Sequence, residues 1–173
     1  PGFYHLSCGD VFRALNHRSE LGQIFLKYSS EGRLVPDEFT IRLWLEHIHT
    51  LVDTGVFNPD EEVLVLDGIP RNVHQSQMME EYIEVILLVC LDTEEQDKLI
   101  ERMRRRALHE NRLDDANETV IRARFDEYAK ETEAILQYYP TDRILKVDAS
   151  RSPIEVLSDV IGVVRFASAE VTV

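Results

Sequence analysis

Four arginines in the second half of the chain have a spacing that suits phosphate binding. Arg102 and Arg106 are four residues apart and would share one helix face, Arg112 follows closely, and Arg124 lies about two turns into the next predicted helix. Arginine can bind a phosphate through two parallel hydrogen bonds, and fixed positive charge stabilises a phosphoryl group in transfer. The charge pattern alone fits equally well a solvated surface on which these arginines pair with glutamates.

Two short loops each combine a carboxylate, a glycine and an arginine. The first is residues 7–10 (Ser-Cys-Gly-Asp) with Arg13 one turn into the following helix, and the second is residues 67–71 (Asp-Gly-Ile-Pro-Arg) with Gln75 four residues further on. Both follow apolar runs predicted to be strands, and ligands of α/β proteins bind at the carboxyl ends of parallel strands. A carboxylate in such a loop can order Mg²⁺ and its waters. A capped helix start and a proline turn remain the structural alternatives for the two loops.

Apolar periodicity predicts the elements that must position these residues. Continuous apolar runs predict strands that are buried on both faces, and alternation of strands with helices indicates a parallel α/β sheet. In the helix that Pro36 opens, residues 41, 45, 48 and 52 are expected to form the buried stripe. Predicted strands cover residues 3–6, 63–66, 85–91 and 144–147, and predicted helices begin at Asp10 as N-cap and at about residues 19, 36, 93, 117 and 153.

Composition and charge exclude several classes of function. The 173 residues fit one domain, and the net charge of −13, from 19 basic and 32 acidic residues, argues against binding a nucleic acid polymer. Cys8 and Cys90 stand far apart in no paired motif, so a disulfide framework or zinc site is not expected. No apolar run approaches a membrane span and no signal peptide is visible, so we expect a cytoplasmic protein without a membrane partner.

Four blocks of sequence together resemble the adenylate kinase family, and the resemblance extends to about residue 160. It implies a P-loop NTPase-like three-layer α/β fold with a parallel sheet, and a single nucleoside monophosphate kinase domain over residues 1–173. It also implies reversible transfer of the terminal phosphoryl group of ATP to AMP with Mg²⁺, by a protein expected to be a monomer. The blocks are residues 5–13, residues 32–38, residues 66–71 with Gln75, and residues 112–115 with Arg124.

The resemblance assigns roles in the monophosphate site by position. Arg13 and Arg71 would bind the phosphate of the monophosphate, and Gln75 would read its base. Cys8 and the backbone near Val35 would line the same site. Helices from about residue 10 to 52 would form a mobile monophosphate-binding arm.

The resemblance also assigns the catalytic and ATP-binding residues. Arg106, Arg112 and Arg124 would surround the phosphates in transit, and Asp67 would help to order the Mg²⁺ shell through water. Arg102 would lie near the ATP base, and Arg106 would also contact ATP. Residues 106–112 would form a short lid, which contains no cysteine for a zinc site.

Three departures from the family pattern matter. The family opens with a strand and the loop G-x-x-x-x-G-K-[ST], but no glycine here is followed by lysine. We therefore expect the central first strand, between the strands ending at Asp67 and Leu91, and the P-loop to be missing from a truncated chain. Cys8 stands where adenylate kinases usually have Thr and pyrimidine monophosphate kinases Ala, and Ile69 replaces a usual Phe. A UMP/CMP kinase and a non-catalytic nucleotide-binding relative are therefore the alternatives.

Overall fold

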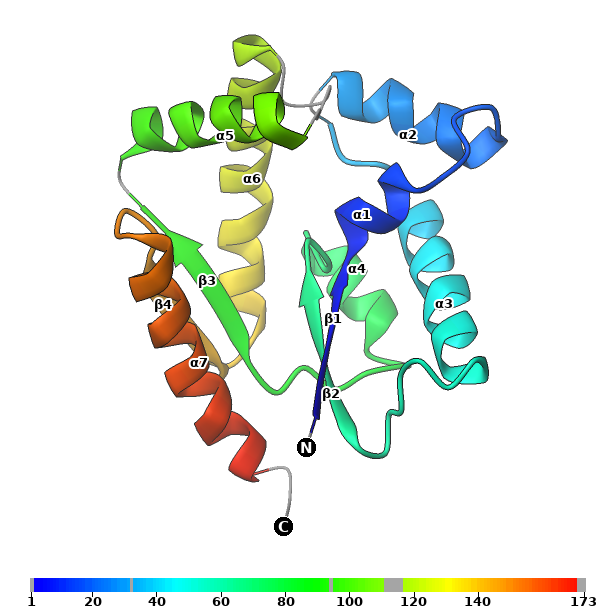
Figure 1. The fold of residues 1–173 in the computed structure, drawn as a ribbon, viewed down its shortest axis with the longest axis vertical. Helices are drawn as coiled ribbons and strands as arrows, with labels where there is room; N and C mark the ends of the chain where they lie inside the picture. The colour runs from blue at the N-terminus through cyan, green and yellow to red at the C-terminus, as the bar shows by residue number, and fades with distance from the viewer. Residues whose placement is uncertain (1, 32, 94, 111–116, 171–173) are drawn as a thin grey trace. The chain divides into compact units, whose positions relative to one another are not determined.

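The structure is a computed structural model that describes residues 2–31, 33–93, 95–110 and 117–170. By contacts within the chain it divides into two compact units, Pro1–Tyr82 (unit 1) and Ile83–Val173 (unit 2), which are described separately below. In chain order the elements, labelled in Figure 1, are β1 (Gly2–Ser7), α1 (Cys8–Arg13), α2 (Glu20–Ser30), α3 (Asp37–Asp53), β2 (Glu62–Asp67), α4 (Val73–Met79), β3 (Leu88–Asp92), α5 (Gln96–Glu110), α6 (Glu118–Tyr138), a 3-10 turn (Thr141–Arg143), β4 (Ile144–Asp148) and α7 (Pro153–Glu170).

Unit 1 is built around a parallel pair of strands. β1 pairs with β2 in a register that sets Ser7 opposite Asp67, so the carboxyl ends of both strands lie at the same edge. α1 follows β1 without a connecting loop, because Ser7 is both the last residue of the strand and the N-cap of the helix. Residues 7–10, expected as a loop, are therefore the end of β1 and the first turn of α1, and they lie next to the loop after β2.

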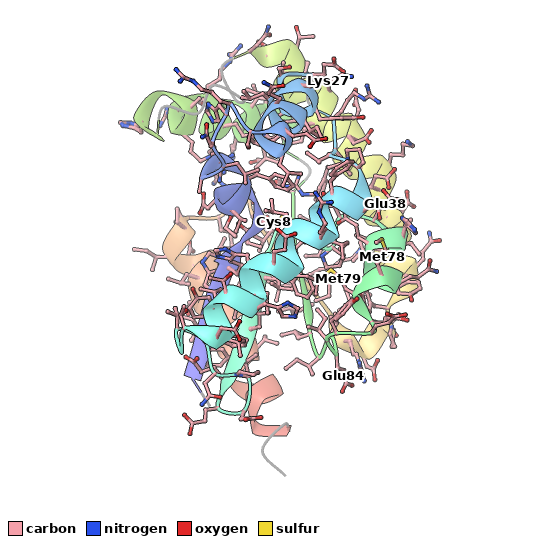
Figure 2. All side chains as sticks on the ribbon, turned by 90° about the vertical axis from the view of Figure 1, so that its right-hand side faces the viewer. Cys8, Lys27, Glu38, Met78, Met79 and Glu84 are labelled. Carbon is pink, nitrogen blue, oxygen red and sulfur yellow. The ribbon has the colours of Figure 1, made fainter. Side chains whose placement is uncertain are left out.

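Helices α3 and α4 lie side by side in unit 1 and bury its largest side chains. Trp44 of α3 is 2% exposed and Met79 of α4 is 1% exposed. Met79, labelled in Figure 2, lies on the side of α4 nearest α3. The rings of Phe12 and Phe25 stack with centroids 5.2 Å apart, which packs α2 against α1. The helices at the edge of β1 and β2 therefore share one apolar interior.

Unit 2 repeats the parallel strand pairing with longer helices. β3 pairs with β4, with Cys90 opposite Lys146, and Figure 1 shows α7 running alongside β4. α5 packs on α6, whose first turn is capped by Asn117, since the Asn117 Oδ1 accepts a hydrogen bond from the Thr119 N–H at 2.9 Å. The parallel α/β class expected from the sequence is confirmed.

Three local expectations are wrong. Asp10 lies in the first turn of α1 and Ser7 takes the N-cap position, because the helix begins as soon as strand pairing ends. The strands are also less buried than a both-faces pattern predicts, and Leu91 is 50% exposed. The strand expected over residues 85–91 begins at Leu88, because Leu88 is the partner of the first residue of β4. Upstream of it, the carbonyl of Val85 accepts a hydrogen bond from the Arg143 guanidinium at 2.9 Å.

The buried stripe of α3 also differs from the expected one. Its buried residues are Thr40, Ile41, Leu43 and Trp44, whereas Val52 is 38% exposed. Of the residues expected in the stripe only Ile41 is fully buried. The buried positions fall in the first half of α3, the half that begins with Asp37 and its contacts to α4 described below.

Gly22 provides a test of the packing at the start of α2. A Cβ atom on Gly22 would lie 2.1 Å from the backbone oxygen of Asn16, in the turn that Ser19 closes by accepting a hydrogen bond from the Gly22 N–H. We expect Gly22→Ala to lower the free energy of unfolding by about 1–3 kcal/mol, the usual cost of forced overpacking. Denaturant unfolding followed by circular dichroism measures the change.

Gly162 of α7 is the matched control, because a Cβ there meets nothing within 4 Å. Gly162→Ala should raise stability by about 0.5–1 kcal/mol, since alanine loses less backbone entropy in a helix than glycine. Equal effects of the two substitutions would contradict the tight contact at Gly22.

Candidate functional site

The carboxyl ends of β1 and β2 bring Cys8 together with Asp67 and Arg71. The Cys8 side chain is buried, and burial is the main cause that raises the pKa of its thiol to about 11, with Arg71 opposing the rise and Asp67 adding to it. The thiol is therefore protonated at neutral pH and is a poor nucleophile. Cys8 serves as a small packed side chain beside a carboxylate and a guanidinium.

The loop after β2 folds around its own arginine. Gly68 has a φ of +78°, a conformation that favours glycine, and its carbonyl accepts a hydrogen bond from the Arg71 Nε at 2.8 Å. A Cβ on Gly68 would lie 3.1 Å from the Arg71 Nη2. The guanidinium therefore lies close over the backbone of the loop, and the hydrogen bond from Nε fixes its direction.

The first turn of α1, directly after β1, also lies under an arginine. The Arg13 guanidinium lies across Gly9, where an added Cβ would be 3.0 Å from Nη2, and it forms an ion pair with Asp10 at 2.5 Å. Because Ser7 and Asp67 are paired across the strands, two guanidinium groups lie over glycine backbone at one edge of unit 1. Such an edge suits an anion with several oxygen atoms.

Asp37, the first residue of α3, accepts hydrogen bonds from three side chains at the start of α4. The Gln75 Nε2 donates to Oδ1 at 2.8 Å, the Asn72 Nδ2 donates to Oδ1 at 3.1 Å, and the His74 Nδ1 lies 2.9 Å from Oδ2. Burial tends to raise the pKa of Asp37, but the hydrogen bonds from His74, Gln75 and Asn72 outweigh it and the pKa is lowered. The group is therefore a carboxylate at neutral pH.

Sequence reasoning missed Asp37, Asn72 and His74 as members of this site. The signal that was available is the sequence block at residues 32–38, which contains Asp37, and the position of Asn72 before α4. Asn72 caps α4 because its Oδ1 accepts a hydrogen bond from the Gln75 N–H at 2.7 Å. The same side chain therefore starts the helix and contacts α3.

Val35 lies two residues before Asp37 in the segment that leads into α3. It is half-buried, and its carbonyl accepts a hydrogen bond from the hydroxyl of buried Thr40 at 3.5 Å, while the carbonyl of Pro36 accepts from the same hydroxyl at 3.3 Å. The backbone predicted to line the site is thus tied to the first turn of α3, next to the Asp37 contacts.

In unit 2, Arg102 ties α5 to the loop between β4 and α7. Its guanidinium donates to three backbone carbonyls, those of Ala149 at 2.5 Å, Ser150 at 3.2 Å and Arg151 at 3.1 Å. These bonds make Arg102 a structural brace of that loop. Its predicted place near the ATP base stays a prediction.

Other arginines of α5 and α6 differ in how far they are buried. Arg106 and Arg124 are half-buried, on the packed helices α5 and α6. Arg104 and Arg122 both pair with Glu118 at the exposed start of α6, as the solvated-surface alternative predicts for such residues. Arg112, expected in the same cluster, lies outside the described residues.

Comparisons with known proteins point to one family. A family model described as adenylate kinase matches residues 2–144. The chain is 36% identical over 150 residues to the adenylate kinase of Porphyromonas gingivalis, covering 83% of this chain and 73% of that protein. It is 33% identical over 162 residues to the adenylate kinase of Cyanothece sp., covering 90% and 79%, and 33% identical over 191 residues to that of Syntrophomonas wolfei, covering 90% and 84%.

The chain belongs to the adenylate kinase family. Family membership confirms the resemblance seen in the sequence. In this family member the structure brings Cys8, Arg13, Asp67 and Arg71 to one edge of unit 1, beside the Asp37 contacts. Their convergence with Arg106 and Arg124 of unit 2, and the assigned roles of all these residues, stay predictions.

The role of Asp67 in ordering Mg²⁺ stays a prediction. Among the described residues no group of three or more His, Cys, Asp and Glu side chains could hold a metal ion. Asp67 is an exposed carboxylate at the end of β2, and Mg²⁺ in nucleotide sites is usually held by one or two carboxylates together with phosphates.

None of the described helices has both the length and the apolar character that crossing a bilayer requires.

The lowered pKa of Asp37 predicts how stability depends on pH. A carboxylate whose folded-state pKa is below its ordinary 3.8 stabilises the fold above that pH, and the contribution is lost as pH falls through the folded-state value. Asp37→Asn should cost about 1–2 kcal/mol at neutral pH, the size expected for weakened charged hydrogen bonds. The difference from wild type should shrink as pH drops below about 4.

Urea unfolding from pH 7 down to pH 3 measures this difference. Asp60→Asn, which removes an exposed carboxylate of unit 1, is the control and should change stability little at any pH. A penalty for Asp37→Asn that stays constant over the whole pH range would contradict the role of the carboxylate charge.

Proposed function

We propose that this protein is a nucleoside monophosphate kinase that transfers the terminal phosphoryl group of ATP reversibly to AMP. The observation that supports the proposal most is the pair of guanidinium groups, Arg13 and Arg71, folded over glycine backbone at the joined ends of β1 and β2. Arg13 is held by contacts within α1 and Arg71 by contacts within the loop after β2, so both can bind a phosphate with little loss of conformational freedom.

The proposed division of labour carries over the roles that the family resemblance assigned by position. Arg13 and Arg71 bind and orient the monophosphate, so that one of its oxygens can attack the terminal phosphorus of ATP. Arg106, Arg112 and Arg124 supply the positive charge that phosphoryl transfer requires, because this chemistry needs positioning and charge more than a covalent intermediate. Asp67 would hold Mg²⁺ through water, and the bound ion would neutralise phosphate charge.

Gln75 is proposed to contact the base of the monophosphate, with the backbone at Val35 beside it. The support is the position of its side-chain amide, which hydrogen-bonds both the Arg71 N–H and Asp37 and so joins the phosphate-binding loop to the start of α3. Action as a monomer and a place in the cytoplasm belong to the same proposal.

UMP or CMP is the second candidate acceptor, because of Cys8. The thiol is buried and protonated, and a thiol is only a weak hydrogen-bond donor. It therefore forms a weaker hydrogen bond with a nucleobase than the hydroxyl that is usual at this position in adenylate kinases. A coupled assay of the product of the complete gene with ATP, Mg²⁺ and either AMP, CMP or UMP distinguishes these acceptors. Highest kcat/KM with AMP supports the proposal, and no turnover with any of them contradicts it.

Arg71→Ala tests the phosphate-binding role in the same assay. We expect a loss of roughly 2–4 kcal/mol of transition-state stabilisation in kcat/KM, because a fixed charge on the transferring group is removed. Arg42→Ala is the control, since Arg42 is an exposed arginine of α3 that pairs only loosely with Glu46 at 3.8 Å. Turnover of Arg71→Ala close to that of Arg42→Ala would rule out the assigned role.

A further inference from the structure

The side-chain amide of Gln75 is held at both ends. Gln75 is 1% exposed, its Oε1 accepts a hydrogen bond from the Arg71 N–H at 2.8 Å, and its Nε2 donates to the Asp37 Oδ1 at 2.8 Å. A backbone N–H can only donate and a carboxylate can only accept. Rotating the amide by 180° would therefore set donor against donor and acceptor against acceptor, so only one orientation satisfies both neighbours.

The Asp37 carboxylate is itself fixed. Asn72 donates to it through Nδ2, while the Oδ1 of the same side chain caps α4, so Asn72 cannot turn without losing a hydrogen bond. His74 contacts the other carboxylate oxygen at 2.9 Å. Asp37 is the first residue of α3, whose N-terminal half is the buried half. The acceptor that faces Gln75 therefore has a set position and direction.

A fixed amide can distinguish two classes of nucleobase. After the two hydrogen bonds described, Gln75 retains one hydrogen on Nε2 and one lone pair on Oε1. Adenine and cytosine present an exocyclic amino donor, whereas hypoxanthine, guanine and uracil present an exocyclic oxygen acceptor at the equivalent position. An amide that rotates freely could hydrogen-bond either class of base. An amide of fixed orientation hydrogen-bonds only one class when the base is bound in a given orientation.

We propose that Asp37 is a positioning residue that fixes the orientation of the Gln75 amide and thereby makes the site select amino bases over oxo bases. This inference rests on the proposed function, in which Gln75 contacts the base of the monophosphate. Asp37 does not contact the nucleotide itself. It acts through Gln75, and its removal should change the choice between bases as well as the overall affinity.

The test compares binding of AMP and IMP, which differ only at the edge of the base, by isothermal titration calorimetry. The wild type should bind AMP at least about tenfold more tightly than IMP, because the wrong base leaves buried polar groups unpaired. Asp37→Asn should reduce this ratio about fivefold, since the asparagine amide can either donate or accept and the loss is worth about one hydrogen bond. A purely structural role would weaken AMP and IMP equally and leave the ratio unchanged.

Glu38→Gln is the matched control. It makes the same change of charge at the next residue of α3, on an exposed side chain labelled in Figure 2, and it should leave the AMP to IMP ratio at the wild-type value. A wild-type ratio near one, or an unchanged ratio in Asp37→Asn, would overturn the inference while AMP binding still supports the function. Failure of the wild type to bind AMP, IMP, CMP and UMP would reject the proposed function and the inference with it.

A second measurement needs no variant and covers the case in which Asp37→Asn does not fold. In nuclear Overhauser spectra of the ligand-free wild type, the Gln75 Nε2 protons should give a stronger cross-peak to the Asn72 Nδ2 protons than to the Arg71 amide proton. This order follows because Gln75 Nε2 and Asn72 Nδ2 donate to the same Asp37 oxygen. The reverse order would show the opposite amide orientation and would refute the inference.

Discussion

The Asp37 carboxylate connects two helices that are separated by a strand and a loop in the sequence. It accepts hydrogen bonds from Asn72 and Gln75 and lies against the His74 ring, so the polar groups at the start of α4 are satisfied by the start of α3. Without this acceptor, the Nε2 of the buried Gln75 amide would lose its partner at a cost of about 1–3 kcal/mol. The position of Gln75, and through it the N–H of Arg71, follows from this single charge.

The second constraint is the parallel register of β1 and β2. Pairing of Ser7 with Asp67 brings the start of α1 and the loop after β2 to one edge, and each places a glycine under its own arginine, Gly9 under Arg13 and Gly68 under Arg71. A side chain at either glycine would crowd the guanidinium. The geometry explains why these two segments combine glycine with arginine, and why the phosphate-binding role of the adenylate kinase family can be proposed for them.

Local signals in the sequence predicted much of this fold correctly. Ser19 and Asn117 cap the starts of α2 and α6, where the sequence predicted that these helices begin. These features depend on hydrogen bonds and backbone preferences within a few residues. The strand ends that carry Asp67 and Ser7 were equally visible, because an apolar run stops there.

The features that sequence reasoning missed depend on distant partners. Asp37 meets Asn72 and Gln75 across 35 and 38 positions, so nothing in its own neighbourhood reveals that it is the shared acceptor. The start of β3 is set by where β4 begins, and the buried half of α3 depends on the helices that contact it, α4 and α1. Hydrophobic periodicity cannot supply either fact, because it describes one element at a time.

The most direct test of a single monophosphate site in unit 1 is a titration of the ¹⁵N-labelled protein with AMP, followed by amide chemical shifts. If α1 and the loop after β2 bind one phosphate, the amides of residues 8–13 and 67–75 should shift together and give the same dissociation constant. Shifts confined to one of these segments, or two segments that respond at different AMP concentrations, would contradict the account.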